Sequence, residues 1–252
     1  MSKIALITGA TAGIGEACAL LFAQQKYNLI LLARRADRLE SLAGKLSEEF
    51  GIEVKTLVAD VRIREEVQNL EALPADWKKV DVLINNAGLS QGLDPINAGS
   101  TTDWDVMIDT NVKGLLYVTK IVSNWMISNG GGHIINLGSI AGKETYINGN
   151  VYCATKHAVD SLNRAMRIDL LPYKIRVTAI HPGAVETEFS EVRFKGDTEK
   201  AKKVYDGYEP LHAEDIAETI WFVVSRPPHV NINDMIVMPT AQANTTHLLR
   251  EI

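Results

Sequence analysis

Near its first residue the chain carries an apolar segment, a glycine-rich turn and a helical pattern, and this combination constrains the fold most. The apolar segment covers residues 4–8, and a helix is expected over residues 14–25. The turn between them reads Thr8-Gly9-Ala10-Thr11-Ala12-Gly13-Ile14-Gly15. Glycines permit a tight turn and a close approach of ligand to backbone, and a helix N-terminus offers free N–H groups with a partial positive charge. The pattern predicts a diphosphate-binding site. Its spacing differs from the usual G-x-G-x-x-G, and a turn needed only for close packing is the alternative.

Composition indicates an ordinary globular protein. The 252 residues, 46% apolar and 23% charged, suffice for one large α/β domain. The net charge of −5 gives no basic face for nucleic acid, and no segment approaches the roughly 18 apolar residues that span a membrane. The first strand leaves no room for a signal peptide. Cys18 and Cys153 follow no metal-binding spacing and the six histidines form no cluster, so we expect a cytoplasmic protein with reduced thiols and no metal site.

Short aliphatic runs alternate with helical patterns along the chain. The expected strands are residues 4–8, 28–33, 53–59, 80–85, 132–138, 175–180 and 234–238. The expected helices are residues 14–25, 37–50, 63–72, 102–118 continuing towards 128, 151–171 and 213–225. Continuous apolar strands suit a parallel sheet covered on both faces. The alternation predicts one domain over residues 1–252 with a doubly wound open sheet.

A polar stretch over residues 186–210 interrupts this alternation. It follows an expected strand, so it should lie outside the carboxyl edge of the sheet. Long excursions in compact domains often cover a binding site. We therefore expect either a substrate lid or a solvated surface helix without a chemical role.

Two arginines follow the second expected strand. Arg34 and Arg35 lie about twenty residues past the glycine turn, where an NAD site would carry an acid for the ribose 2′-hydroxyl. Guanidinium groups there can instead hold the 2′-phosphate of NADP by charge-assisted hydrogen bonds. Asp37 falls into the following helix, where it opposes the helix dipole. The position favours NADP(H), and solvated surface charges are the alternative.

Tyr152 and Lys156 are spaced to share one face of an expected helix. A free tyrosine has a pKa near 10, and a neighbouring cation favours its phenolate. Ser139 follows an expected strand, from where its hydroxyl could orient a substrate oxygen towards Tyr152. A Tyr–Lys pair alone usually means packing, but its conjunction with a dinucleotide turn indicates proton transfer.

Together these residues resemble the short-chain dehydrogenase/reductase family. The motifs are residues 8–15, Asn85-Asn86-Ala87-Gly88, Ser139, Tyr152-x-x-x-Lys156 and Pro182-Gly183, in the family's order and over essentially the whole chain. The resemblance implies a single Rossmann-type α/β domain, a doubly wound parallel seven-stranded sheet with helices on both faces, and a homotetramer. It also implies a catalytic tetrad of Asn111, Ser139, Tyr152 and Lys156, in which a local helix break at Asn111 holds a water that connects Lys156 to solvent.

The resemblance extends to the cofactor. Asp60 and Val61 would contact adenine, Asn86 to Gly88 would lie beside the riboses, and Thr187 would hold the carboxamide. The complete set expected to bind NADP(H) is Gly9, Thr11, Gly13, Ile14, Gly15, Arg34, Arg35, Asp60, Val61, Asn86, Ala87, Gly88, Tyr152, Lys156, Pro182, Gly183, Val185 and Thr187.

Three segments narrow the resemblance to NADP-dependent 3-hydroxy acid dehydrogenases. They are residues 149–152, 188–197 and 229–233. That branch acts on serine, allo-threonine and 3-hydroxyisobutyrate and reduces malonic semialdehyde. The substrate would contact Ser139 and Tyr152, and its carboxylate needs a cation, for which Arg193 is the candidate. Arg193 pointing to solvent or to a neighbouring subunit is the competing interpretation.

Other functions stay open at this point. The enzyme could reduce other aldehydes or ketones, including bulkier ones. A regulator that senses NADP(H) without turnover would not need all four tetrad groups, and all four are present. His181 could face the cofactor, but it is expected to fill space at a strand end. Cys153 is expected to be a packed thiol.

Overall fold

Seven parallel strands form one sheet in the order β3-β2-β1-β4-β5-β6-β7. This computed structural model describes residues 2–251. The strands are β1 (Ile4–Thr8), β2 (Asn28–Ala33), β3 (Val54–Val58), β4 (Val82–Asn85), β5 (Gly132–Leu137), β6 (Ile175–Pro182) and β7 (Asp234–Val237). The order reverses direction between β1 and β4. In open sheets of this kind, ligands bind outside the carboxyl ends of the strands at that reversal.

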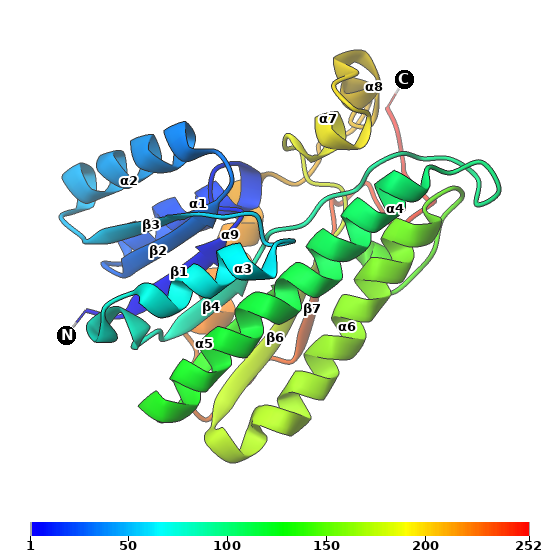
Figure 1. Cartoon of the computed structure of the whole chain (residues 1–252). Coiled ribbons are helices and arrows are strands. Elements are labelled where there is room, and N and C mark those ends of the chain that lie inside the picture. Colours follow the sequence, from blue (N-terminus) through cyan, green and yellow to red (C-terminus); the bar gives the residue numbers. More distant parts are fainter. Residues whose placement is uncertain (1, 252) are drawn as a thin grey trace.

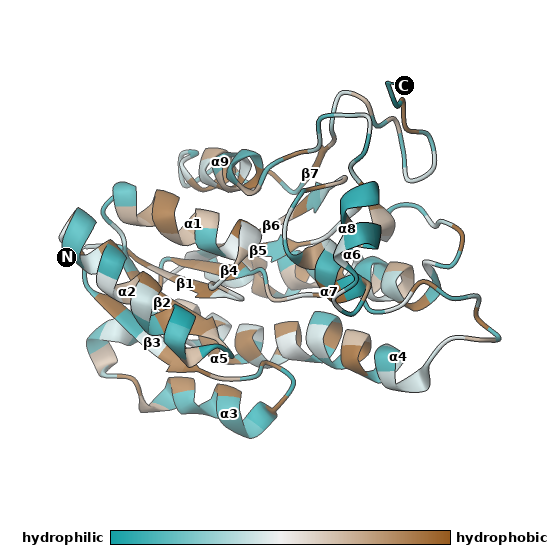
Figure 2. Ribbon diagram, turned by 90° about the horizontal axis from the view of Figure 1, so that it is seen from above, coloured by the Kyte–Doolittle hydropathy of each residue, from teal (hydrophilic) through white to brown (hydrophobic). Residues whose placement is uncertain are grey.

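Helices cover both faces of the sheet, which confirms the doubly wound Rossmann-type fold (Figure 1). One face carries α1 (Gly13–Gln24), α2 (Ala36–Phe50) and α9 (Ala213–Val224). The other carries α3 (Arg64–Gln68), α5 (Leu115–Asn129) and α6 (Asn150–Leu170). Apolar side chains of the helices meet the central strands in two core layers (Figure 2). No helix among residues 2–251 is long and apolar enough to cross a membrane.

The two edge strands differ from the expectation that all strands are covered on both faces. All five residues of β1 are buried, as expected for a central strand. In β3, Lys55 and Thr56 are exposed, and in β7 the Ile236 side chain is about half exposed. Each edge strand has a neighbouring strand on one side only, so it is more exposed than its apolar pattern predicts.

The helix expected from residue 102 towards 128 is interrupted. The structure contains α4 (Thr101–Ile108), a π-helical turn η3 (Asp109–Gly114) and then α5. The break lies where the family resemblance implies one. The helix expected over residues 63–72 likewise becomes α3 followed by the 3₁₀ turn η1 (Asn69–Ala72). Three short 3₁₀ turns were not expected: η2 (Ala75–Lys78), η4 (Ile140–Gly142) and η5 (Leu171–Tyr173).

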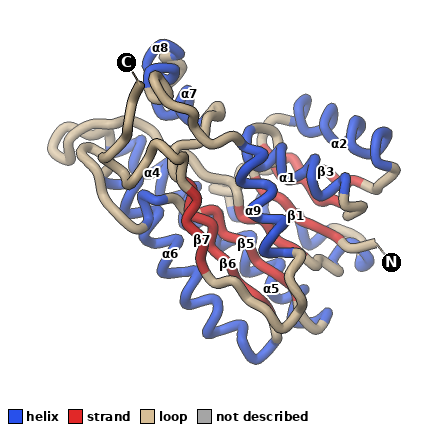
Figure 3. Tube along the Cα trace, turned by 180° about the vertical axis from the view of Figure 1, so that it is seen from behind, coloured by secondary structure: helices blue, strands red, loops and turns tan. Residues whose placement is uncertain are grey.

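The polar stretch over residues 186–210 forms two short helices above the carboxyl ends of the strands (Figures 1 and 3). These are α7 (Phe189–Arg193) and the hydrophilic α8 (Thr198–Lys203). The segment after β7 returns beside them, where the Glu251 N–H donates to the Gly207 carbonyl at 2.7 Å. The Arg250 guanidinium also donates to the Val204 carbonyl at 3.1 Å. The end of the chain therefore holds this stretch in place.

Candidate active site

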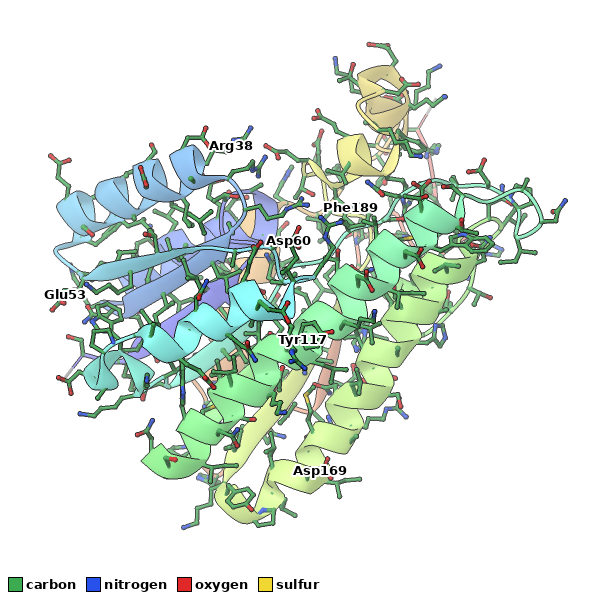
Figure 4. The ribbon with its side chains drawn as sticks, in the orientation of Figure 1. Arg38, Glu53, Asp60, Tyr117, Asp169 and Phe189 are labelled. Carbon is green, nitrogen blue, oxygen red and sulfur yellow. The ribbon has the colours of Figure 1, made fainter. Side chains whose placement is uncertain are left out.

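A cleft of about 320 Å³ lies at the carboxyl ends of the strands. Of the residues expected to bind NADP(H), all except Gly15 line it, together with Ser139. Figure 4 labels Asp60 and Phe189, which both line this cleft, whereas Asp169 lies at the far end of α6. Lining residues that the sequence did not single out are Ala12, Leu32, Ala33, Ala59, Leu89, Thr110, Leu137, Gly138, Glu188, Phe189 and Val192. Five of these, Leu32, Ala33, Ala59, Leu137 and Gly138, lie at a strand end.

The glycine turn leaves the N-terminus of α1 open to the cleft. Gly9 has a φ of +66°, which favours glycine. Gly15 lies under the turn, and a Cβ there would come within 2.2 Å of the Gly9 carbonyl oxygen, which explains why Gly15 does not line the cleft. The N-cap residue, Ala12, offers no side-chain acceptor, so no capping side chain occupies the first N–H groups of α1. These groups can donate to an anion. This geometry fits the expected diphosphate site.

Charged side chains gather beyond β2, where the 2′-phosphate is expected. Arg35 donates to one carboxylate oxygen of Glu188 at 2.8 Å, and Arg38 donates to the other at 2.6 Å. Hydrogen bonding from Arg35 holds the pKa of Glu188 below its usual range. Arg34 is 60% exposed and lies 3.8 Å from Asp60. Burial acts to raise the pKa of Asp60, but hydrogen bonds from Arg62 outweigh it and lower that pKa. A cluster of paired charges therefore lies where the 2′-phosphate is expected, and it includes Arg38 and Glu188.

Ser139, Tyr152 and Lys156 converge where β5 ends and α6 begins. Tyr152 and Lys156 are buried side chains of α6 that both line the cleft, as their spacing predicts. Ser139 is hydrogen-bonded to Tyr152 through its side chain. Its hydroxyl oxygen also accepts from the Ala141 N–H at 3.1 Å. Lys156 donates from Nζ to the Leu137 carbonyl at 2.8 Å.

Burial and neighbouring polar groups set the electrostatics around Tyr152. Burial raises the pKa of Tyr152, and the Arg193 cation and the Ser139 hydrogen bond oppose that increase. Burial also lowers the pKa of Lys156 to about 8. The Lys156 ammonium is directed at the Leu137 carbonyl and the cation that opposes the raised pKa of Tyr152 is Arg193, so the expectation that Lys156 lowers this pKa stays a prediction.

Asn111 lies in the π-helical turn η3. Its Oδ1 accepts from the Leu89 N–H at 2.8 Å, and its Nδ2 donates to the Leu89 carbonyl at 2.8 Å and to Thr155 Oγ1 at 3.0 Å. A Cβ at Gly88 would lie 3.3 Å from Asn111 Oδ1 and 3.5 Å from Lys156 Nζ, so both groups flank Gly88. The helix break thus brings Asn111 beside Lys156.

Arg193 is half-buried and packs against aromatic side chains beside the site, although it is not among the residues that line the cleft. Its guanidinium carbon lies 5.2 Å from the centre of the Tyr152 ring and 5.1 Å from that of Phe189. One terminal nitrogen donates to the Tyr146 hydroxyl at 2.9 Å. Its Nε is buried and has no hydrogen-bond partner among the described residues. Tyr146 was missed by sequence reasoning, which offered no signal beyond its place between Ser139 and Tyr152.

Both cysteines match their expected state. Cys18 and Cys153 are buried and free, and burial raises the pKa of both thiols. His181 is also fully buried, but it contacts charged groups and not only apolar neighbours.

Comparison with known proteins agrees with this geometry. The short chain dehydrogenase family model matches residues 3–198. The NADP-dependent 3-hydroxy acid dehydrogenase YdfG of Salmonella typhi is 48% identical over 242 residues, covering 95% of this chain and 96% of that protein. The NADP-dependent 3-hydroxy acid dehydrogenase of Schizosaccharomyces pombe is 42% identical over 251 residues, covering 99% and 97%.

Solved structures give the same relationship. The closed form of a serine dehydrogenase complexed with NADP⁺ superimposes with a TM-score of 0.91 at 44% identity, covering 99% of this chain and all of the other. Serine dehydrogenase from Escherichia coli superimposes with a TM-score of 0.82 at 40% identity, covering 95% and 99%.

Proposed function

The chain belongs to the short-chain dehydrogenase family and is an NADP-dependent oxidoreductase, and we propose that its substrates are small 3-hydroxy acids. It would interconvert the hydroxyl and carbonyl groups of compounds such as serine, allo-threonine, 3-hydroxyisobutyrate and malonic semialdehyde. Relatives named for 3-hydroxy acid and serine dehydrogenases support this substrate class. The contacts of Arg193 beside the cleft support it independently.

The observation that carries the proposal is the position of Arg193. A half-buried guanidinium beside Tyr152 and Phe189, with a buried Nε that has no partner among the described residues, offers donors for an anionic group of the substrate. A guanidinium presents a planar fork that matches the two oxygens of a carboxylate. The carboxylate of a 3-hydroxy acid is fixed two carbons from the reacting carbon, so one cation beside Tyr152 would orient the whole substrate.

The four expected catalytic residues would divide the chemistry between them. Tyr152 would donate a proton to the carbonyl oxygen in reduction and accept it from the hydroxyl in oxidation. Ser139, hydrogen-bonded to Tyr152, would orient that oxygen. Lys156 would hold the nicotinamide ribose hydroxyls, and Asn111 beside it would maintain the proton path to solvent.

The cleft fits NADP(H) along its length. The uncapped N-terminus of α1 suits the diphosphate. Arg34 and Arg35 line the cleft where the 2′-phosphate would bind, and Arg35 would exchange its contact with Glu188 for the phosphate. The residues at the ends of β3, β4 and β6 would hold adenine, ribose and carboxamide in the roles described above. NADP(H) supplies or accepts the hydride when it is bound.

We also propose a cytoplasmic homotetramer that binds neither nucleic acid nor membrane. Apolar side chains remain exposed along the helices that carry Asn111 and Tyr152, among them Ile108, Leu116 and Ile168. Exposed apolar groups of this kind favour a subunit interface. Sedimentation of the purified protein would give the number of subunits directly.

The test is a comparison of substrates that differ in one charge. Oxidation of serine and 3-hydroxyisobutyrate with NADP⁺ would be followed at 340 nm beside oxidation of their methyl esters. The proposal expects kcat/KM to be clearly higher for the acids. A preference for esters or uncharged aldehydes would favour a general carbonyl reductase. Tight NADPH binding without turnover of any compound would favour the regulator.

A further inference from the structure

The imidazole of His181 lies against the turn that carries Ser139. His181 is a residue of β6 with no exposed surface, and its Nδ1 lies 3.1 Å from the Ser139 carbonyl oxygen. A carbonyl oxygen only accepts hydrogen bonds, so Nδ1 carries the proton in this contact. The Nε2 atom lies near the Asp234 carboxylate but forms no hydrogen bond with any described residue.

The same ring restricts the residue before Ser139. A Cβ at Gly138 would lie 2.4 Å from Nδ1 and 2.6 Å from Cε1 of His181. A side chain at residue 138 would therefore clash with the ring, and glycine lets the Gly138 backbone lie in direct contact with it. The Gly138 N–H also donates to the Ile180 carbonyl at 2.8 Å, which fixes the turn to the strand that carries His181.

Charged side chains surround the imidazole on the side that faces away from Ser139. Nε2 lies 3.1 Å from Asp234 of β7 and 3.6 Å from Asp160 of α6. Lys143 forms ion pairs with both carboxylates, and Arg164 pairs with Asp160 at 2.9 Å. The Lys143 ammonium therefore bridges the two carboxylates next to the imidazole. Burial lowers the pKa of His181 while Asp234 opposes it, so the neutral ring is favoured.

We propose that His181 is a positioning residue that sets the direction of the Ser139 hydroxyl by holding the Ser139 carbonyl. This inference rests on the catalytic role proposed above for Ser139. The Ser139 hydroxyl faces Tyr152 and accepts from the Ala141 N–H, while the backbone carbonyl of the same residue accepts from the imidazole. Loss of the imidazole hydrogen bond would let the carbonyl rotate and move the hydroxyl away from the substrate oxygen.

Two isosteric substitutions separate the two ring nitrogens. In His181→Asn the amide nitrogen takes the place of Nδ1 and can still donate to the Ser139 carbonyl. In His181→Gln it takes the place of Nε2 and faces Asp234 instead. Single-turnover hydride transfer would be measured at saturating NADPH with the fastest carbonyl substrate, beside NADPH affinity and the melting temperature.

We expect His181→Asn to stay within about threefold of the wild-type rate. His181→Gln and His181→Leu should lose tenfold or more, because a displacement of about 1 Å can cost about 10²-fold. NADPH affinity should stay unchanged in all three variants. Equal rates for the Asn and Gln variants, or losses that follow the melting temperature alone, would overturn the inference.

A double-mutant cycle with Ser139→Ala distinguishes this inference from the proposed function. If His181 acts through Ser139, adding His181→Leu to Ser139→Ala should cause no further loss. A further tenfold loss in the double variant would show that His181 acts independently, and the inference would fail. Full activity of Ser139→Ala itself would refute the role proposed for Ser139, whatever the His181 variants do.

Discussion

Arg35 and Glu188 form an ion pair with a nitrogen–oxygen distance of 2.8 Å, which joins the turn after β2 to the start of α7. The Glu188 carboxylate thus contacts the donors expected for the 2′-phosphate of NADP(H), and Arg38 binds the same carboxylate. A phosphate and a carboxylate compete for guanidinium donors of this kind. Cofactor binding and the position of residues 186–210 are therefore linked through Glu188.

Cofactor choice should depend on the two arginines after β2. The double variant Arg34→Asp, Arg35→Ala should reverse or erase the preference for NADP over NAD. A hydrogen bond to a charged group is worth about 1.5–3 kcal/mol, or roughly ten- to a hundredfold in kcat/KM for NADP. Measurement of kcat/KM with both cofactors tests this. An unchanged preference in the double variant would place the 2′-phosphate elsewhere.

Removal of the Glu188 charge should strengthen NADPH binding. Glu188→Gln frees Arg35 and Arg38 from their carboxylate partner, and exposed ion pairs contribute about 0–1 kcal/mol, so the dissociation constant should fall by up to about fivefold. The effect should shrink at high salt. Glu191→Gln is the matched control, because Glu191 is an exposed acid of α7. The same change in both variants, or in neither, would argue against competition at Arg35.

Loss of the Tyr152 hydroxyl should abolish proton transfer while leaving cofactor binding nearly intact. Tyr152→Phe should lower kcat by about 10²–10⁴-fold, the usual contribution of general acid–base catalysis. Because burial raises the pKa of Tyr152, oxidation should accelerate as pH rises and the phenolate becomes populated. Tyr173→Phe, at a half-exposed tyrosine after α6, is the control and should behave as wild type. Retention of most turnover by Tyr152→Phe would refute the assignment.

A buried histidine far from the chemistry should make stability depend on pH. Burial lowers the pKa of His133 from 6.5 to about 3, and its Nε2 lies 2.8 Å from Thr178 Oγ1. Below pH 6.5, His133 therefore binds a proton in the unfolded chain but stays neutral in the folded protein. The free energy of unfolding falls as pH falls. The loss is about 1.4 kcal/mol per pH unit.

His133→Gln, which keeps a donor near Thr178, should remove that slope. Urea unfolding of both proteins between pH 7 and 5 measures it. The free energy of unfolding of the wild type should fall by about 2 kcal/mol more than that of the variant. Parallel pH dependence of the two proteins would mean that His133 titrates normally.

Local sequence patterns were sufficient for the sheet and for the glycine turn, Ser139, Tyr152 and Lys156, whereas Asn86 and the other positions beside adenine and ribose came from the family resemblance. The strand ends that carry Gly9, Asn86 and Ser139 meet at one edge because parallel strands place their carboxyl ends together. The i,i+4 spacing of Tyr152 and Lys156 likewise decided their common face. Each of these inferences needs only a strand, a helix and its period.

The remaining features depend on contacts between distant segments. The pairing of Arg38 with Glu188 spans 150 residues, and the contact of His181 with Ser139 spans 42. A pattern within one element carries no information about such partners. The exposure of β3 and β7 was missed for a related reason, because an edge strand and a central strand can share the same apolar run.

The substrate charge should be recognised by Arg193. Arg193→Met should raise KM for serine or 3-hydroxyisobutyrate markedly, while activity towards an uncharged aldehyde changes far less. Because Arg193 also opposes the raised pKa of Tyr152, its loss should slow proton transfer for both substrates. The informative quantity is therefore the ratio of the two kcat/KM values, in which that common effect cancels.

Two further variants sharpen the test of Arg193. Arg193→Lys should restore only part of the preference for acids, because an ammonium lacks the bidentate fork of a guanidinium. Tyr146→Phe removes the hydroxyl that accepts from Arg193 at 2.9 Å but keeps the ring. The Arg193 charge is therefore retained, while its guanidinium is oriented less firmly. We expect it to lower the preference for acids less than Arg193→Met does. If Arg193→Met slows both substrates in parallel, or neither, another group binds the carboxylate and the assignment of 3-hydroxy acids loses its structural support.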